Sequence, residues 1–256
     1  MSNNIAQNPQ FWKIFLIRNY SFLWLSSFLS MMSVQLRIIC TGFILYEITG
    51  SGFSLGILGI IQLAFQMPSI LFGGVFADFL KRTSQIVVTQ TLSFIIIFGL
   101  FLLAYNGLLS SWHIYFSTAL LSITSTVTNP ARSALTANLV PKKQLLNAVA
   151  ANTATMQIGS VVAPVIFGVL TISTDTSIPL LLGSIAAIVS AWACFMIKID
   201  KLNGEKTKMQ PIKNILEGVS YVKKHPILPG LYLLAVSYTH LRAHETSLHL
   251  VCRLLL

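Results

Sequence analysis

Six long apolar stretches alternate with short polar connections along the first two hundred residues of the chain. Each stretch holds about twenty residues or more, which is enough for a helix to cross the hydrocarbon core of a bilayer. The pattern therefore predicts an all-α membrane protein whose six-helix transmembrane bundle covers residues 20–197. The expected spans are residues 20–46, 54–76, 85–105, 112–128, 145–172 and 177–197.

The basic residues lie almost entirely on one side of this alternation, in the N-terminal segment and in every second connection. Of the 15 Lys and Arg residues before position 236, 14 lie in the N-terminal segment or in the segments that follow spans two, four and six. The positive-inside rule then places residues 1–19 and the segment after residue 197 in the cytoplasm of a multi-pass protein of the plasma or inner membrane. The cations before residue 198 in these segments are Lys13, Arg18, Lys81, Arg82, Arg132, Lys142 and Lys143, and the exception inside a span is Arg37.

Composition supports the membrane assignment. The chain is 54% hydrophobic and only 9% charged, whereas a soluble domain carries about 25% charged residues. Its net charge of +10 follows mostly from the membrane topology, so the lipid bilayer is the expected partner and nucleic acid is not. Cys40 and Cys194 are isolated within spans and are interpreted as packing residues. We expect no metal site and no cofactor.

The segments after span six differ from one another. Residues 198–226 form a lysine-rich linker in which Ile212, Ile215 and Leu216 recur at helical spacing. This spacing predicts an amphipathic helix on the cytoplasmic membrane surface, with a partner-binding helix as the alternative. Residues 227–235 are interpreted as the start of a seventh span, so the authentic protein is expected to be longer.

The last segment, residues 236–256, breaks the apolar run and brings three of the five histidines. It resembles a translated sequencing adapter, which implies a non-native tail that should be excluded from fold and function. The alternative is a genuine histidine-rich tail that binds metal.

A short polar turn between spans two and three carries the most specific local signal. Small residues end the helix, and an acid and two bases follow at Gly74, Ala77, Asp78, Lys81 and Arg82. Asp78 can pair with nearby cations or cap a neighbouring helix, which would make a polar latch that breaks when two helix bundles separate. The alternative is a solvated loop at the membrane edge.

This turn resembles the signature between helices two and three of the major facilitator superfamily. Phe79, Lys81 and Thr83 depart from that pattern and leave the charge network of the loop thinner. Other stretches resemble the branch that contains enterobactin exporters and macrolide efflux proteins, namely residues 18–24, 46–51, 129–135, 140–141 and 147–150.

The resemblance implies a twelve-helix transporter made of two six-helix halves. This chain would be the N-terminal half, with three-plus-three inverted repeats, truncated early in helix seven. The missing C-terminal half of the same protein and a small-molecule substrate would then be its partners. The resemblance also implies export coupled to a proton or other ion gradient.

Span five contains small residues and a proline in one stretch. Gly159, Ala163, Pro164 and Gly168 resemble a motif of drug antiporters in this superfamily, although alanine replaces the glycine before proline. The residues by themselves indicate close helix packing, because Thr155, Gly159 and Ala163 form a small stripe and a proline weakens the local backbone hydrogen bonding.

Polar groups within the spans are the candidate substrate contacts. Span one places Ser26, Ser30, Ser33, Arg37 and Thr41 on one helical face. A cation at mid-bilayer costs about 2.5–3.5 kcal/mol on insertion scales, so Arg37 should face a water-filled cavity or an acid. It would meet either an anionic substrate or a carboxylate of the absent half, and interhelical hydrogen bonding alone is the third option.

Four amide side chains extend this set of cavity candidates. They are Gln62 and Gln66 in span two, and Asn152 and Gln157 in span five. Each could line the cavity or form a hydrogen bond between helices. No Asp or Glu lies near the middle of the six spans.

The sequence thus predicts a secondary active transporter that exports a small amphipathic organic molecule, drug- or siderophore-like, by alternating access. The alternatives are an uptake permease or lipid transporter of the same superfamily, or a non-transporting scaffold. An enzyme is not expected, because no cluster of His, Asp or Glu lies at a membrane face.

Overall fold

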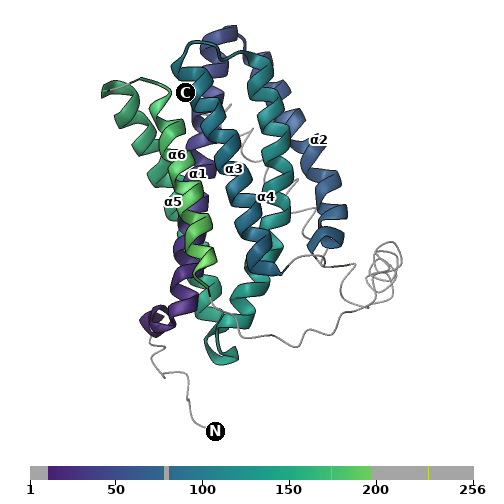
Figure 1. Cartoon of the computed structure of the whole chain (residues 1–256), viewed down its shortest axis with the longest axis vertical. Helices are drawn as coiled ribbons and strands as arrows, with labels where there is room; N and C mark the ends of the chain where they lie inside the picture. Colours follow the sequence, from purple (N-terminus) through teal and green to yellow (C-terminus); the bar gives the residue numbers. More distant parts are fainter. Residues whose placement is uncertain (1–10, 78–80, 174, 198–229, 231–256) are drawn as a thin grey trace, which may run out of the picture. The chain divides into compact units, whose positions relative to one another are not determined.

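The computed structural model describes residues 11–77, 81–173, 175–197 and 230, and it contains six long helices (Figure 1). The chain divides into two units, and all six helices lie in the first, Met1–Asn203. The helices are α1 Arg18–Thr49, α2 Gly52–Ala77, α3 Arg82–Tyr105, α4 Ser111–Leu139, α5 Leu145–Ser173 and α6 Ile178–Phe195. Two short 3-10 helices, η1 Phe11–Leu16 and η2 Lys142–Gln144, precede α1 and α5.

Successive helices run in opposite directions, so the bundle has two ends. We call the end with the α1–α2, α3–α4 and α5–α6 connections the Gly50 end, and the end where α1, α3 and α5 begin the Arg18 end. Gly50 closes α1 in a left-handed conformation (φ 62°), and its N–H donates to the Tyr46 carbonyl at 2.8 Å. Glycine adopts this conformation without steric cost, which allows the short turn into α2.

The first helix is the centre of the bundle. Helix α1 packs against α6, α5 and α4, while α3 packs against α6 and α4. Helix α2 packs mainly against α4, and α5 packs mainly against α1, so these two lie toward the outside (Figure 1). Large apolar side chains on them are exposed, including Phe53, Ile60, Val161 and Ile172, as expected for surfaces that meet lipid or other helices.

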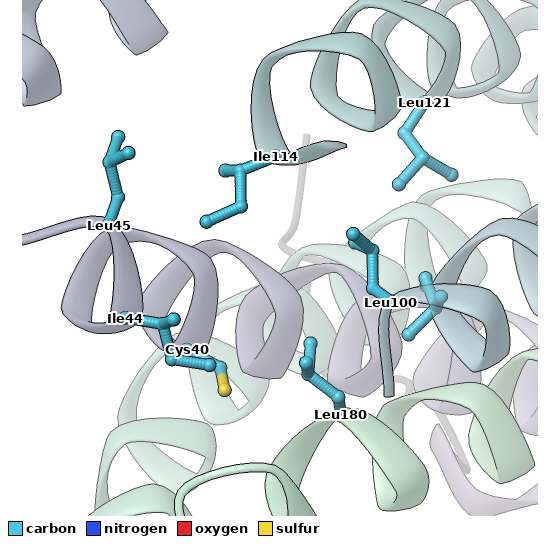
Figure 2. Close-up of a cluster of buried hydrophobic side chains, with 8 residues drawn as sticks. Cys40, Ile44, Leu45, Leu100, Ile114, Leu121 and Leu180 are labelled. Atoms are coloured by element: carbon cyan, nitrogen blue, oxygen red, sulfur yellow. The ribbon is translucent and has the colours of Figure 1, made fainter. Parts of the chain in front are cut away.

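Two apolar clusters lie toward the two ends of the bundle. The Gly50-end cluster comes from α1, α3, α4 and α6 (Figure 2), and its buried members are Cys40, Ile44, Leu45, Ile97, Leu100, Ile114, Leu121 and Leu180. The Arg18-end cluster comes from the same four helices, with Leu23, Ile86, Ala131, Leu135, Cys194 and Ile197. The polar interior described below lies between these clusters.

The helices confirm the predicted all-α membrane fold. Five of the helical segments are long and apolar enough to cross a membrane, corresponding to α1, α2, α3, α5 and α6. Helix α4 is less apolar because its buried face carries hydroxyls, at Ser117, Thr118, Ser122, Thr124, Thr128 and Thr136. Most of these hydroxyls donate to carbonyls of the preceding turn, which satisfies them inside the bundle.

Several predictions concern segments outside the described residues. These are the linker with its amphipathic helix at 198–226, the start of a seventh span at 227–235 apart from residue 230, the tail at 236–256, and Asp78 with its two following neighbours. They stay predictions.

Candidate functional site

The polar face of α1 points into the bundle. Ser26, Ser33, Arg37 and Thr41 are all buried, and Arg37 is only 6% exposed. The Thr41 hydroxyl donates to the Arg37 carbonyl at 2.7 Å, and so has its partner within the helix. Because these positions recur at helical spacing, one side of α1 becomes the polar wall of the interior.

A cavity of about 430 Å³ lies against this wall, between α1, α3, α4 and α5. Its size falls within the range of small-molecule sites. Polar side chains lining it come from all four helices, and apolar side chains are interspersed among them. The lining consists of Ser27, Ser30, Met31, Ser33, Val34, Arg37, Gln90, Ser93, Ile97, Leu121, Thr124, Ser125, Thr128, Asn129, Arg132, Ser133, Asn152, Thr155 and Met156.

Arg37 lines the cavity near the Gly50 end. Among the described residues, its guanidinium has no hydrogen-bond or ion-pair partner, and the lining residues Ser33, Val34 and Ile97 carry no charge. A guanidinium has five N–H donors and remains charged in proteins. Its donors are therefore available to a group that enters the cavity.

Arg132 lines the same cavity nearer the Arg18 end. The sequence pattern placed it in the connection between the fourth and fifth spans, but α4 continues beyond Thr128 to Leu139 and carries Arg132 inside the bundle. Its Nη1 donates to the hydroxyls of Ser27 at 2.9 Å and Ser26 at 3.2 Å, and its Nη2 to that of Ser190 at 3.3 Å. Arg132 thus joins α4 to both α1 and α6.

A second polar link crosses the cavity wall between α1 and α3. The Gln90 amide donates to the Ser30 hydroxyl, and both side chains line the cavity. Gln90 is not among the cavity residues predicted from the sequence. Gln85, Thr89, Gln90 and Ser93 recur at helical spacing in an apolar span. This polar face is the signal that could have identified Gln90.

The four predicted amides divide between two places. Asn152 lines the cavity, and its side-chain nitrogen also donates to the Thr136 hydroxyl of α4 at 3.2 Å. Gln62 and Gln66 are partly buried on α2, outside the lining of this cavity, and Gln157 is exposed on α5. The structure thus places Asn152 in the same cavity lining as Arg37 and leaves the three glutamines outside it.

The turn predicted as a latch is only partly described. Gly74 and Ala77 lie in the last turns of α2, and Lys81 and Arg82 are exposed where α3 begins, while Asp78 lies outside the described residues. The latch therefore stays a prediction.

The small-residue motif of α5 lies against α1. Ala163 is fully buried and packs with Met32 and Leu36, and a Cβ on Gly159 would lie 2.8 Å from the Met31 Cγ. Pro164 lies within the helix, whereas a Cβ on Gly168 would have no neighbour within 4 Å. Close packing thus concerns the first half of the motif.

Comparison with known proteins places this architecture in a family. The family model described as "Major Facilitator Superfamily" matches residues 23–246, which include all of α2 to α6 and most of α1. A search of curated proteins gave no significant match. Because the match covers most of the chain and the described part is a bundle of membrane-length helices around a polar cavity, the chain belongs to the Major Facilitator Superfamily of multi-pass membrane transporters.

Proposed function

We propose that the chain is the first half of a secondary active transporter that exports a small amphipathic organic molecule. Alternating access would be achieved by rocking of two six-helix halves around a site near mid-membrane. The described cavity supports this proposal because it joins hydroxyl and amide groups to apolar surfaces such as Met31, Val34 and Met156. Such a mixed lining suits a molecule with a polar group and an apolar body.

The observation that carries the proposal is the state of Arg37. A buried cation is stable only when solvated or paired, and Arg37 is 6% exposed without a partner among the described residues. Its position in the lining gives a cavity-bound ligand direct access to its donors. We therefore assign Arg37 as the residue that contacts the polar group of the substrate.

Direction and coupling rest on the resemblance to exporters. The described residues hold two acids, Glu47 and Asp175, and both are exposed at the Gly50 end. Neither can exchange a proton within the cavity. If export is driven by protons, the carrier would lie in segments beyond those described, and we place it in the second half of the transporter.

Replacement of Arg37 tests this assignment in cells that express the full-length transporter. Arg37→Gln should reduce export of an accumulated fluorescent amphiphile by about tenfold or more, since a buried charged hydrogen bond contributes about 1.5–3 kcal/mol. Lys143→Gln is the matched control, because Lys143 is an exposed cation in η2. Unchanged export by Arg37→Gln at equal surface expression would remove Arg37 from the substrate site.

A second experiment tests the proposal that this chain is half of a transporter. Liposomes containing only the 256-residue chain should show no gradient-dependent accumulation of the same amphiphile. The reason is that alternating access requires two halves that move against each other. Concentrative, gradient-dependent flux in these liposomes would show that the half-transporter interpretation is wrong.

A further inference from the structure

Two cations line one cavity at different depths. Arg37 precedes Cys40 of the Gly50-end cluster by three residues along α1, whereas Arg132 follows Ala131 of the Arg18-end cluster along α4. Ser27 accepts a hydrogen bond from Arg132, and it precedes Arg37 by ten residues on α1. A helix rises about 1.5 Å per residue, so the backbone positions of Ser27 and Arg37 are separated by about 15 Å along α1.

The hydrogen-bond partners of Arg132 do not neutralise its charge. All three of its described contacts are neutral hydroxyls, on Ser26, Ser27 and Ser190. They use three of the five guanidinium N–H donors, so two remain among the described residues. These serines fix the position of the guanidinium without neutralising it.

No described carboxylate is positioned to neutralise either cation. Glu47 and Asp175 are exposed at the Gly50 end, and the lining of the cavity contains two arginines and no acid. Coulomb interactions are strong in a site with a low dielectric constant, so an anion that enters this cavity gains from both charges. A cationic ligand would be repelled by them.

We propose that Arg132 forms a second anion-binding position, and that the substrate is an amphiphile carrying an oxyanion such as a carboxylate or phosphate. This inference rests on the proposed transport function and adds the charge of the substrate. The planar guanidinium matches an oxyanion with two parallel hydrogen bonds. The apolar body of the ligand would contact Met31, Val34 and Met156, which lie in the same lining.

The separation of the two positions has a consequence for transport. Arg37 and Arg132 project into the cavity from these two backbone levels, on α1 and α4. Ser30 and Ser33 lie between the two levels on α1 and line the cavity. They offer hydroxyls along the path from one cation to the other, so an anionic group can move along this wall between Arg132 and Arg37.

Paired fluorescent probes test the inference directly. The 256-residue chain in nanodiscs of zwitterionic phosphatidylcholine would be titrated with dansylglycine, a carboxylate, and with its neutral amide, dansylglycinamide. Arg132→Gln should weaken binding of dansylglycine by about tenfold and change binding of the amide by less than about twofold. Arg132→Lys should retain most of the preference for the carboxylate, and the exposed-cation control Lys143→Gln should retain all of it.

Each result has a distinct meaning. If wild-type chain binds both probes and Arg132→Gln leaves dansylglycine binding unchanged, or weakens both probes equally, Arg132 has only a structural role and the inference is wrong. If wild-type chain binds neither probe, the proposed substrate cavity itself is refuted. Thermal unfolding of each variant, measured in parallel, shows whether the α1–α4–α6 contact is retained.

Discussion

The contact between Gly159 of α5 and Met31 of α1 gives a prediction that depends on one methyl group. A Cβ at position 159 would lie 2.8 Å from the Met31 Cγ and 3.3 Å from the Met32 Cε. The first distance is shorter than any ordinary carbon–carbon contact, so Gly159→Ala must displace Met31 or separate the two helices. Met31 lines the cavity, and its displacement would also alter the space available to a ligand.

Two opposing terms determine the size of the effect. Overpacking a close contact costs about 1–3 kcal/mol, while replacing glycine by alanine inside a helix contributes about 0.5–1 kcal/mol of stability. We therefore expect Gly159→Ala to lower the free energy of unfolding by about 1 kcal/mol, within a range of about 0–2.5 kcal/mol. Gly168→Ala is the matched control in the same helix, because a Cβ there has no neighbour within 4 Å. It should raise the free energy of unfolding by about 0.5–1 kcal/mol.

Buried thiols provide the assay. Cys40 and Cys194 are both buried, so a thiol-reactive fluorogenic dye reports unfolding of the bundle once Cys252 has been replaced by serine. Denaturant titrations in micelles would compare both variants with the same background. Opposite shifts are expected, and shifts of the same sign and size would refute the close-packing argument for Gly159.

Three further predictions use denaturant titrations; the pH-dependent one is followed by tryptophan fluorescence, because the dye reacts with thiolates and these are absent at acid pH. Asp175 accepts a hydrogen bond from the Ser177 N–H at 2.7 Å, which holds the pKa of its carboxyl below the ordinary value of 3.8. The resulting stabilisation is present above that value and lost as pH falls below it. The difference in the free energy of unfolding between wild type and Asp175→Ala should therefore be smaller at about pH 3 than at about pH 6. Tyr20→Phe removes a hydrogen bond of 3.2 Å to the Ala148 carbonyl, and a loss of about 0.5–1.5 kcal/mol is expected, whereas an unchanged midpoint would mean that this bond contributes nothing. Ser190→Ala removes a buried hydroxyl that donates to an α1 carbonyl at 2.7 Å, so it should destabilise by about 1 kcal/mol, and equal or greater stability would contradict this role.

Much of the helical architecture could be predicted from residue pattern alone. Twenty-residue apolar stretches can satisfy their backbone groups in a membrane only as helices, so the six helices and their alternation follow from the positions of polar residues. Helical spacing also places the serines and Arg37 on one face of α1, and this face is buried in the structure. The family resemblance agrees with the matched superfamily, while the finer exporter branch stays a proposal.

Helical spacing alone could not predict which residues line the cavity. Periodicity shows which residues share a face, but it does not show which neighbour that face meets. Gln62 and Gln66 share a face of α2, yet α2 packs mainly against α4 and its glutamines lie outside the cavity lining. Gln90 lies in an apolar span and is absent from the predicted cavity residues, yet it lines the cavity and contacts Ser30.

Arg132 shows the same division most clearly. Its charge, beside the basic residues of the following connection, indicated a position at the membrane edge, because an isolated cation is costly in an apolar medium. The tertiary structure supplies three serine hydroxyls from two other helices, and these contacts allow α4 to carry the cation into the bundle. The sequence by itself determined the helices, their alternation and the polar face of α1. Only the packing of α1, α4 and α6 decided that two cations share one cavity, because serines distant in the chain must come together to solvate the Arg132 guanidinium.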